Sequence, residues 1–279
     1  MKILVTGANG FLASRIIDFY KDKHNIIGLS RRQMDFTIYD QVKKAFDYYK
    51  PDIAIHCGAI SDVGACTKDP ELSYMVNVLG TKNMATACSI YNTKLIFCSS
   101  DQVYFESPIQ EPHMEAEALT PPHTYGRHKL EAEELALNIN ESTLCLRLSW
   151  MYDKEIKEGE HGSLLPTLME AVKEKTPLKY ITHDYRSITN VWEVVENIQK
   201  LFCLDRGIYN FGSENDLCTY ELVEKVFSLL GGDLGLLEKN DTTFKDNPRN
   251  LRMNTSKIKE KDIHFLSSLD GFKKCLLDK

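Results

Sequence analysis

Tyr125 and Lys129 are the two residues whose types and spacing point most directly to chemistry. They lie four positions apart in a stretch predicted to be helical over residues 125–139, so their side chains share one face, about 6 Å apart along the axis. A phenol with its ordinary pKa of about 10 is a poor acid or base at neutral pH, but an adjacent ammonium lowers that pKa. Such a pair exchanges a proton with a carbinol or carbonyl oxygen while a nicotinamide exchanges hydride with the carbon.

Two polar residues elsewhere in the chain, Ser100 and Asn77, are expected to act together with this pair. Ser100, followed by Asp101, comes at the end of a predicted strand over residues 94–99. Doubly wound sheets bind their ligands at the carboxyl ends of the strands, so a reacting side chain is expected at this edge. Asn77 lies in an apolar helical stretch, where a polar side chain needs a specific hydrogen-bond partner. The Tyr-x-x-x-Lys spacing alone also occurs by chance, and these neighbours favour a catalytic interpretation.

A glycine-containing turn near the start of the chain predicts a phosphate-binding site. Residues 6–13 (TGANGFLA) follow a predicted strand at 2–6 and open a predicted helix at 11–20. Gly7 permits a tight turn, and Gly10 lets the backbone approach a pyrophosphate at the helix N-terminus. The alternative is a turn between strand and helix that holds no ligand.

The end of the second predicted strand decides between the two nicotinamide dinucleotides. An acidic residue there usually binds the 2′-hydroxyl of NAD, whereas an arginine accommodates the 2′-phosphate of NADP. This chain has Ser30, Arg31 and Arg32 at that place and no acid. Two guanidinium groups favour NADP over NAD, with an ordinary solvated basic pair as the alternative. Asp35 and Phe36 follow, where we expect them to border the adenine.

These side chains need a parallel sheet that brings the ends of several strands together. Short apolar runs (2–6, 25–29, 53–57, 94–99 and 144–148) alternate with helical stretches (11–20, 40–49, 70–91 and 125–139). This alternation predicts an α/β fold with a doubly wound parallel (Rossmann) sheet. We expect an NADP-binding Rossmann domain over residues 1–152. A smaller, mixed substrate-binding lobe should occupy most of 153–279, with segments near 185–204 and 249–258 returning to the Rossmann domain.

The second half of the chain is predicted to be less regular than the first. Helical periodicity recurs at residues 163–175, 191–204 and 219–230. Between these helices the sequence predicts polar loops, such as residues 154–161 and 238–250. No internal repeat and no low-complexity tract interrupts the chain, so a single mixed lobe is the simplest interpretation of this half.

Composition excludes several classes of protein. The chain has 279 residues, 43% hydrophobic and 27% charged, with a formal net charge of −6, so neither a disordered nor a fibrous protein is expected. The acidic balance predicts no nucleic-acid partner, and no apolar run is long enough to span a membrane. No signal peptide is recognisable, so we expect a cytoplasmic protein with its eight cysteines reduced. The eight histidines have no metal-ligand spacing, and no metal site is predicted.

The glycine turn, Asn77, Ser100 and the Tyr125/Lys129 pair resemble the extended short-chain dehydrogenase/reductases, and the resemblance runs the length of the chain. Within that group the chain is most similar to the dTDP-4-dehydrorhamnose reductase branch. The stretches that carry this second resemblance are residues 51–56 (PDIAIH), 69–72 (DPEL), 76–81 (VNVLGT), 99–105 (SSDQVYF), 147–152 (RLSWMY) and 249–257 (RNLRMNTSK).

The resemblance implies a role for each matching residue. Tyr125 would be the general acid for a 4-keto oxygen, and Lys129 would lower its pKa and hold the nicotinamide ribose. Ser100 would hydrogen bond to the same oxygen, and Asn77 would support the lysine through a water. Residues 147–150 would border the nicotinamide and the sugar. The catalytic set is therefore Ser100, Tyr125, Lys129 and Asn77, and the substrate-binding set is Ser100, Asp101, Trp150 and Arg186. The cofactor-binding set is Gly7, Asn9, Gly10, Phe11, Leu12, Ser30, Arg31, Arg32, Asp35, Phe36, Gly58, Ala59, Ile60, Tyr125 and Lys129.

Four departures from the branch concern mainly the sugar side of the site. Residues 56–59 are HCGA where the branch usually shows Asn-Ala-Ala-Ala, and Glu106-Ser107 replaces a glycine expected soon after residue 105. Residues 186–189 (RSIT) stand in place of a Gly-x-Pro-Thr segment, and residues 208–212 (IYNFG) are closer to nucleotide-sugar epimerases. The cofactor half of the pattern is intact.

Three functions are open at this point. The first is NADPH-dependent reduction of a 4-keto group on a nucleotide-activated deoxysugar. The second is a nucleotide-sugar epimerase or dehydratase that retains NAD, against which Arg31 and Arg32 argue. The third is a non-catalytic regulatory subunit like the β subunit of methionine adenosyltransferase, against which the intact Ser100, Tyr125 and Lys129 argue. The expected partners are a nucleotide sugar and, because oligomers are common in the family, a second copy in a homodimer.

Overall fold

The structure is a computed structural model that describes residues 1–157 and 163–277. The chain divides into two compact units, each assembled from several segments. The first unit comprises Met1–Val103, Leu119–Arg147 and Val195–Tyr209, and the second comprises Tyr104–Ala118, Leu148–Val194 and Asn210–Lys279. Residues 195–204 thus belong to the first unit, and residues 249–258 belong to the second. The loop predicted at 154–161 lies partly outside the described residues.

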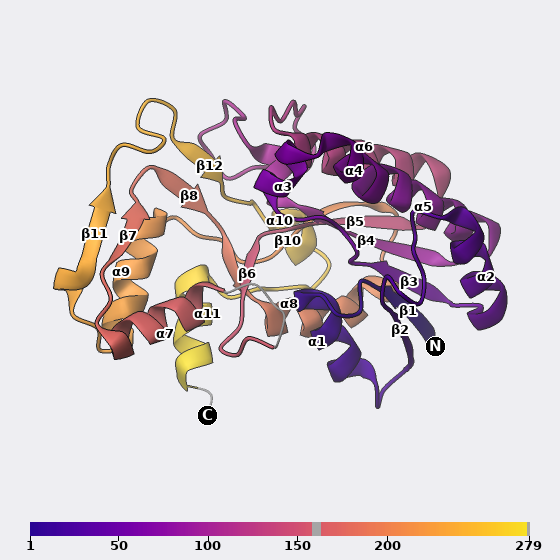
Figure 1. The fold of residues 1–279 in the computed structure, drawn as a ribbon, viewed down its shortest axis with the longest axis horizontal. Coiled ribbons are helices and arrows are strands. Elements are labelled where there is room, and N and C mark those ends of the chain that lie inside the picture. Colours follow the sequence, from indigo (N-terminus) through magenta and orange to yellow (C-terminus); the bar gives the residue numbers. More distant parts are fainter. Residues whose placement is uncertain (158–162, 278–279) are drawn as a thin grey trace. The chain divides into compact units, whose positions relative to one another are not determined.

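The first unit is built around a six-stranded sheet, which confirms the predicted doubly wound α/β fold (Figure 1). The strands are β1 (Lys2–Thr6), β2 (Asn25–Leu29), β3 (Ile53–His56), β4 (Lys94–Ser100), β5 (Thr143–Leu148) and β10 (Gly207–Phe211). They are ordered β2-β1-β3-β4-β5-β10, and the ladders from β2 to β4 are parallel. Because the chain builds β2 on one side of β1 and β3 on the other, β1 and β3 flank the point where such sheets bind ligands.

Helices cover both faces of this sheet (Figure 1). On one face lie α1 (Phe11–Tyr20) and the end of α8 (Val191–Ile198), tied together where the hydroxyl of Tyr20 donates to the carbonyl of Val195 at 2.7 Å. The other face is covered by α2 (Tyr39–Tyr49), α5 (Gly80–Ile90) and α6 (Thr124–Ile139). The apolar residues that predicted the strands fill the core beneath these three helices, among them Leu4, Ala54, Leu95, Phe97 and Cys145.

The second unit contains three small ladders and its own core. The strands are β6 (Trp150–Tyr152), β7 (Leu178–Ile181), β8 (Asp184–Arg186), β9 (Ile188–Asn190), β11 (Leu237–Asn240) and β12 (Arg249–Leu251), paired as β6–β9, β7–β11 and β8–β12. The longer helices are α7 (Leu164–Glu174), α9 (Thr219–Leu229) and α11 (Ser268–Leu277), and shorter ones are η4 (Leu234–Leu236) and α10 (Ser256–Lys259). The predicted loop over 238–250 is wrong at both ends, because β11 and β12 pair with strands far away in the sequence.

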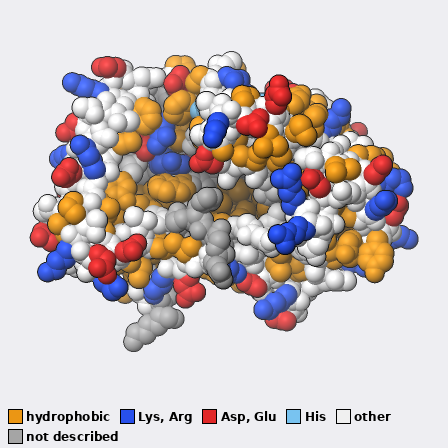
Figure 2. Space-filling view, in the orientation of Figure 1, with side chains coloured by type: hydrophobic (Ala, Val, Ile, Leu, Met, Phe, Trp, Pro, Cys, Tyr) orange, Lys and Arg blue, Asp and Glu red, His pale blue; other side chains and the backbone are white. Residues whose placement is uncertain are grey.

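Three features of the helices and the surface bear on the expectations from composition. Of the helices described, none has the length and apolarity that crossing a membrane requires. Within the described part of the chain, no three or more His, Cys, Asp or Glu side chains are grouped as metal ligands would be. On the face drawn in Figure 2, acidic and basic side chains are interspersed.

Candidate active site

The turn between β1 and α1 brings the backbones of two loops together. Gly7 has a φ of +68°, and a Cβ at this position would lie 2.9 Å from Cα of Gly58, in the loop after β3. The amide of Gly10 donates to the carbonyl of Gly7 at 2.7 Å, and no side chain among the described residues caps α1. Backbone amides at a helix N-terminus attract anions, so this turn fits the diphosphate of a dinucleotide. The same turn contains the other predicted residues Asn9, Phe11 and Leu12.

The basic residues after β2 lie at the surface. The amide and the hydroxyl of Ser30 both donate to the side-chain carbonyl of Gln33, at 2.9 and 2.7 Å, which fixes the start of this loop. The side chain of Arg31 is 72% exposed, and its Nε lies 3.3 Å from the carboxylate of Asp35. Arg32 is also exposed. Both guanidinium groups are therefore accessible to an anionic ligand at the carboxyl end of β2.

Phe36 has a structural role in this region. Its side chain is only 8% exposed and belongs to the core beneath α2 and α5. A Cβ at Gly58 would come within 2.4 Å of its ring, and the ring lies edge-on to the imidazole of His56, with centroids 4.8 Å apart. In this placement Phe36 supports the loop after β3, and its place beside the adenine stays a prediction.

The side chain of Asn77 forms specific hydrogen bonds with the backbone of Ile60. The predicted helix over 70–91 is present as α4 (Pro70–Tyr74) and α5, joined by the π-helical turn η1 (Met75–Leu79) that contains Asn77. The Asn77 side chain is 1% exposed, accepts from the amide of Ile60 at 2.9 Å and donates to the carbonyl of Ile60 at 3.0 Å. The side-chain amide of Asn77 thus holds the loop that contains Gly58, Ala59 and Ile60. The π-helical turn itself is a kind of element that occurs frequently at functional sites.

Ser100 and Tyr125 meet at the carboxyl end of β4. The N-terminus of α6 is capped by His123, whose side chain accepts from the amide of Gly126 at 2.9 Å. The Tyr125 side chain is 6% exposed and lies close enough to the side chain of Ser100 for that group to lower its pKa, and the Ser100 hydroxyl donates to the carboxylate of Asp101 at 3.2 Å. Burial raises the pKa of Tyr125 above its ordinary value, and the interaction with Ser100 offsets the shift only in part. The phenol therefore carries its proton at neutral pH.

Lys129 is a buried cation one helical turn from Tyr125. Its side chain is 2% exposed, its Nζ donates to the carbonyl of Cys98 at 2.6 Å, and it lies 4.3 Å from the centre of the Phe97 ring. Burial lowers the pKa of Lys129 to about 8. For Tyr125 burial has the largest effect, so the net shift of the phenol pKa is upward. The role of Lys129 in lowering that pKa stays a prediction.

Glu133 and Arg147 form a buried ion pair that sequence reasoning missed. The Glu133 carboxylate accepts from Nε of Arg147 at 3.1 Å and from its Nη2 at 2.7 Å, and it also accepts from the hydroxyl of Ser99. Both charged side chains are at most 2% exposed. Arg147 was expected to border the nicotinamide, and instead it joins β5 to α6. The sequence signal that could have drawn attention to this region was Glu133, an acidic residue four positions after Lys129 on the same predicted helix face.

Two predicted substrate residues, Trp150 and Arg186, belong to the second unit. Trp150 begins β6, and Arg186 ends β8. The guanidinium carbon of Arg186 lies 4.9 Å from the centre of the Trp150 ring, at a distance where a cation and an indole attract each other. This contact orders both side chains within the second unit.

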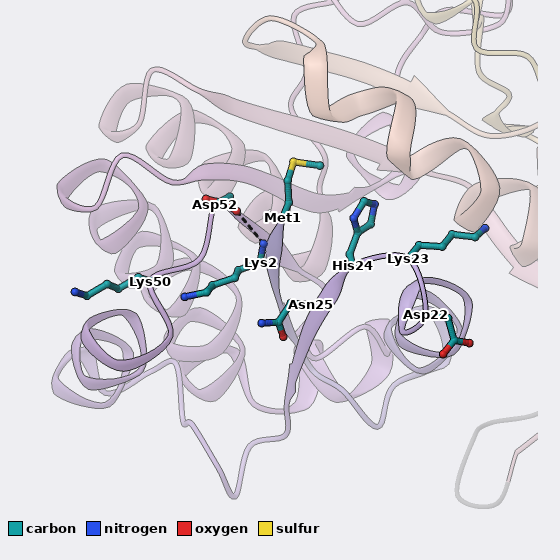
Figure 3. Close-up of a pocket in the computed structure, with 8 residues that line it drawn as sticks. All are labelled: Met1, Lys2, Asp22, Lys23, His24, Asn25, Lys50 and Asp52. Carbon is teal, nitrogen blue, oxygen red and sulfur yellow. Dashed lines mark hydrogen bonds between the residues drawn. The ribbon is translucent and has the colours of Figure 1, made fainter.

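A pocket of about 540 Å³ opens at the amino ends of β1 and β2 (Figure 3). It is lined by Met1, Lys2, Asp22, Lys23, His24, Asn25, Lys50 and Asp52. In it the amide of Lys2 donates to the carboxylate of Asp52 at 2.8 Å. None of the predicted site residues is among those that line this pocket.

A smaller pocket of about 190 Å³ belongs to the second unit and contains one of the departures from the reductase branch. Phe105, Glu106, Phe244 and Arg249 are among the residues that line it. Glu106 has a φ of +59° and Phe244 a φ of +61°, in the left-handed region that L side chains rarely adopt. Glu106 stands close to where the branch usually has glycine, and its backbone conformation is one that glycine adopts without strain.

Fold and site together define a class of protein. A doubly wound sheet with a glycine turn after β1, a serine ending β4 and a Tyr–Lys pair on the following helix is the arrangement of NAD(P)-dependent oxidoreductases of the short-chain dehydrogenase/reductase type. The chain falls in this class. Within this class, the family described as "RmlD substrate binding domain" matches residues 1–274, and the chain belongs to that family.

Named relatives and solved structures agree with this assignment. The chain is 25% identical over 236 residues to a dTDP-4-dehydrorhamnose reductase of Aggregatibacter actinomycetemcomitans, covering 81% of this chain and 78% of the relative. It is 26% identical over 285 residues to methionine adenosyltransferase 2 subunit beta of Xenopus laevis, covering 94% and 83%. The dTDP-4-dehydrorhamnose reductase of Bacillus anthracis, solved in complex with NADP, shares the fold with a TM-score of 0.89, 22% identity and coverage of 100% and 99%.

Proposed function

We propose that the protein uses NADPH to reduce a 4-keto group on a nucleotide-activated deoxysugar. The observation that carries this proposal is that Ser100 and the buried side chain of Tyr125 lie close together at the carboxyl end of β4, with Lys129 buried one turn further along α6. The substrate class is supported by the relative named dTDP-4-dehydrorhamnose reductase. A dTDP-linked 4-keto-6-deoxysugar is therefore the first substrate to test.

The side chains present suit the reduction of a carbonyl group. The hydroxyls of Ser100 and Tyr125 would both donate to the keto oxygen. Because burial raises the pKa of Tyr125, the phenol holds a proton that it can give to the oxygen as negative charge develops there. The ammonium of Lys129 would then stabilise the tyrosinate that remains. When bound, the nicotinamide supplies the hydride that the keto carbon takes up.

Turnover of NADPH with a defined substrate tests the proposal. The purified chain, mixed with NADPH and dTDP-4-dehydrorhamnose, should oxidise NADPH in a one-to-one ratio with the alcohol formed. The absorbance of NADPH and chromatography of the sugar nucleotide measure the two sides of this balance. Conversion of a sugar nucleotide without net NADPH consumption, by protein that carries tightly held NAD, would instead identify an epimerase or dehydratase.

A regulatory subunit is the second candidate function. It is favoured by the similarity to methionine adenosyltransferase 2 subunit beta, which extends over 94% of this chain. Such a protein would bind the dinucleotide and a catalytic partner but would turn over none of the keto sugars in a panel of dTDP-, UDP- and GDP-linked substrates. A partner that co-purifies in a fixed ratio, together with no turnover, would replace the first proposal with this one.

We also propose that Arg31 and Arg32 make the protein prefer NADP(H) to NAD(H). Replacing both with Ala removes two exposed guanidinium groups after β2. Hydrogen bonds to charged groups contribute about 1.5–3 kcal/mol each, so the affinity for NADPH should fall by at least about tenfold while that for NADH is unchanged. Fluorescence titration of both cofactors measures the effect.

A matched control for this double variant is Lys43→Ala, which removes an exposed cation on the surface of α2. It should leave the affinity for both cofactors unchanged. An equal loss of affinity for NADPH and NADH in the Arg31/Arg32 variant would contradict the assignment to the 2′-phosphate. The cytoplasmic location and the homodimer stay predictions.

A further inference from the structure

Cys57 and Cys98 lie side by side at the carboxyl edge of the sheet. The parallel ladder between β3 and β4 pairs His56 with Phe97; Cys57 directly follows β3, and Cys98 is the next residue of β4. Their sulfur atoms are 3.6 Å apart. Both cysteines are free, Cys98 being buried and Cys57 half-buried. Neither thiol has a part in the proposed reduction.

The backbone at these positions has the spacing that a disulfide needs. Neighbouring residues on adjacent strands are about 4.8 Å apart, and disulfides join residues whose Cα atoms are about 4.4–6.8 Å apart. Closing the bond therefore requires the two sulfurs to approach from 3.6 Å to about 2.05 Å, which rotation of the side chains can supply. The strands themselves can keep their register.

The surroundings distinguish the two thiols. The ammonium of Lys129 donates to the carbonyl of Cys98, which places a positive charge beside this residue. The hydrogen bond with Cys57 and the charge of Lys129 both lower the pKa of Cys98, although burial opposes them. The same hydrogen bond, together with burial, raises the pKa of Cys57. Cys98 is thus the more acidic thiol of the pair and its nucleophile, and Cys57 is the less acidic one.

We propose that Cys57 and Cys98 form a redox-active dithiol, a modification site for small hydroperoxides. The Cys98 thiolate attacks one oxygen of hydrogen peroxide, giving a sulfenic acid at Cys98 and hydroxide. The sulfur of Cys57 then displaces hydroxide from the sulfenic sulfur as the Cys57 proton is released, and the S–S bond forms. In total, two thiols are oxidised and one peroxide is reduced to two waters. An external dithiol reverses the change by exchange.

Oxidation of this dithiol would also affect the candidate active site. This step of the inference rests on the proposed function. Cys57 precedes Gly58, whose backbone contacts Gly7 in the phosphate-binding turn. Cys98 carries the carbonyl that holds Lys129. A disulfide would therefore change the side-chain positions directly beneath both the turn and the lysine.

Oxidation of the full chain with hydrogen peroxide, followed by thiol counting and peptide mapping, tests the site itself. Two of the eight thiols should be lost, the intact mass should fall by that of two hydrogen atoms, and one peptide pair should be joined through Cys57 and Cys98. Dithiothreitol should restore both thiols. In Cys57→Ser the crosslink cannot form, and dimedone should trap a sulfenic acid at Cys98.

The matched control is Cys203→Ser, which replaces an exposed cysteine and should leave the crosslink unchanged. The proposal is overturned if Cys57 and Cys98 both stay alkylatable after peroxide treatment, or if oxidation reaches only Cys203. It is also overturned if both are oxidised without becoming linked. Because these measurements need neither cofactor nor sugar, their outcome is independent of whether the proposed reductase activity is found.

Discussion

A Tyr125→Phe variant is expected to lose at least about a hundredfold in kcat for reduction of the 4-keto sugar while binding NADPH as the wild type does. A positioned general acid contributes about 10²–10⁴-fold to a rate, and this change removes only the hydroxyl that carries the proton. The side chain of Tyr125 is 6% exposed, and Phe keeps the same ring, so the packing at this position is retained. Steady-state kinetics with a separate NADPH titration distinguish a lost proton donor from a lost binding site.

The same chemical change at a surface tyrosine provides the control for this variant. Tyr48 is 80% exposed on α2, and Tyr48→Phe should leave both kcat and NADPH affinity unchanged. If Tyr125→Phe kept its full rate, Tyr125 would not be the proton donor. A Tyr125→Phe variant that had instead lost its affinity for NADPH would mean that the hydroxyl holds the cofactor.

What could be predicted from the sequence follows from interactions that are local along the chain. The strand–turn–helix around Gly7 is one continuous segment, and the four-residue spacing of Tyr125 and Lys129 fixes a common helix face by geometry alone. The left-handed φ of Gly7 is likewise a property of its own turn. The carboxyl edge of the sheet was predictable because strand direction follows from the alternation of strands and helices.

What could not be predicted depends on which distant segment covers a side chain. The burial of Phe36 is set by Gly58 and Gly80, which come later in the chain. The net pKa shift of Tyr125 is upward because burial of the phenol outweighs the interaction with Ser100, and burial depends on segments outside the local sequence. Strands β11 and β12 are short and pair with β7 and β8 across long stretches of chain, so their own composition resembles a polar loop. In each case the deciding contact is absent from the local sequence.

An Arg147→Met variant should lose about 3–5 kcal/mol of unfolding free energy. Its guanidinium is 2% exposed and bonded through two nitrogens to Glu133, so its removal leaves a buried carboxylate without its partner. Breaking a buried ion pair from one side costs about this much, because the remaining charge can be neither solvated nor neutralised without penalty. Urea unfolding, with the slope checked for constancy, measures the loss.

A double variant, Glu133→Leu with Arg147→Met, distinguishes the contribution of the ion pair to stability from that of the volume that the two side chains fill. Replacing a buried ion pair with apolar residues of similar volume is often neutral or stabilising, so the double variant should recover most of the stability that Arg147→Met loses. The exposed pair of Lys43 and Asp47, 2.7 Å apart on α2, is the matched surface comparison, and Lys43→Met should cost at most about 1 kcal/mol. A loss as small as this in Arg147→Met would mean that Glu133 is not held as a buried carboxylate. A double variant as unstable as the single one would instead assign the stability to the shape of the two side chains and to the bond from Ser99.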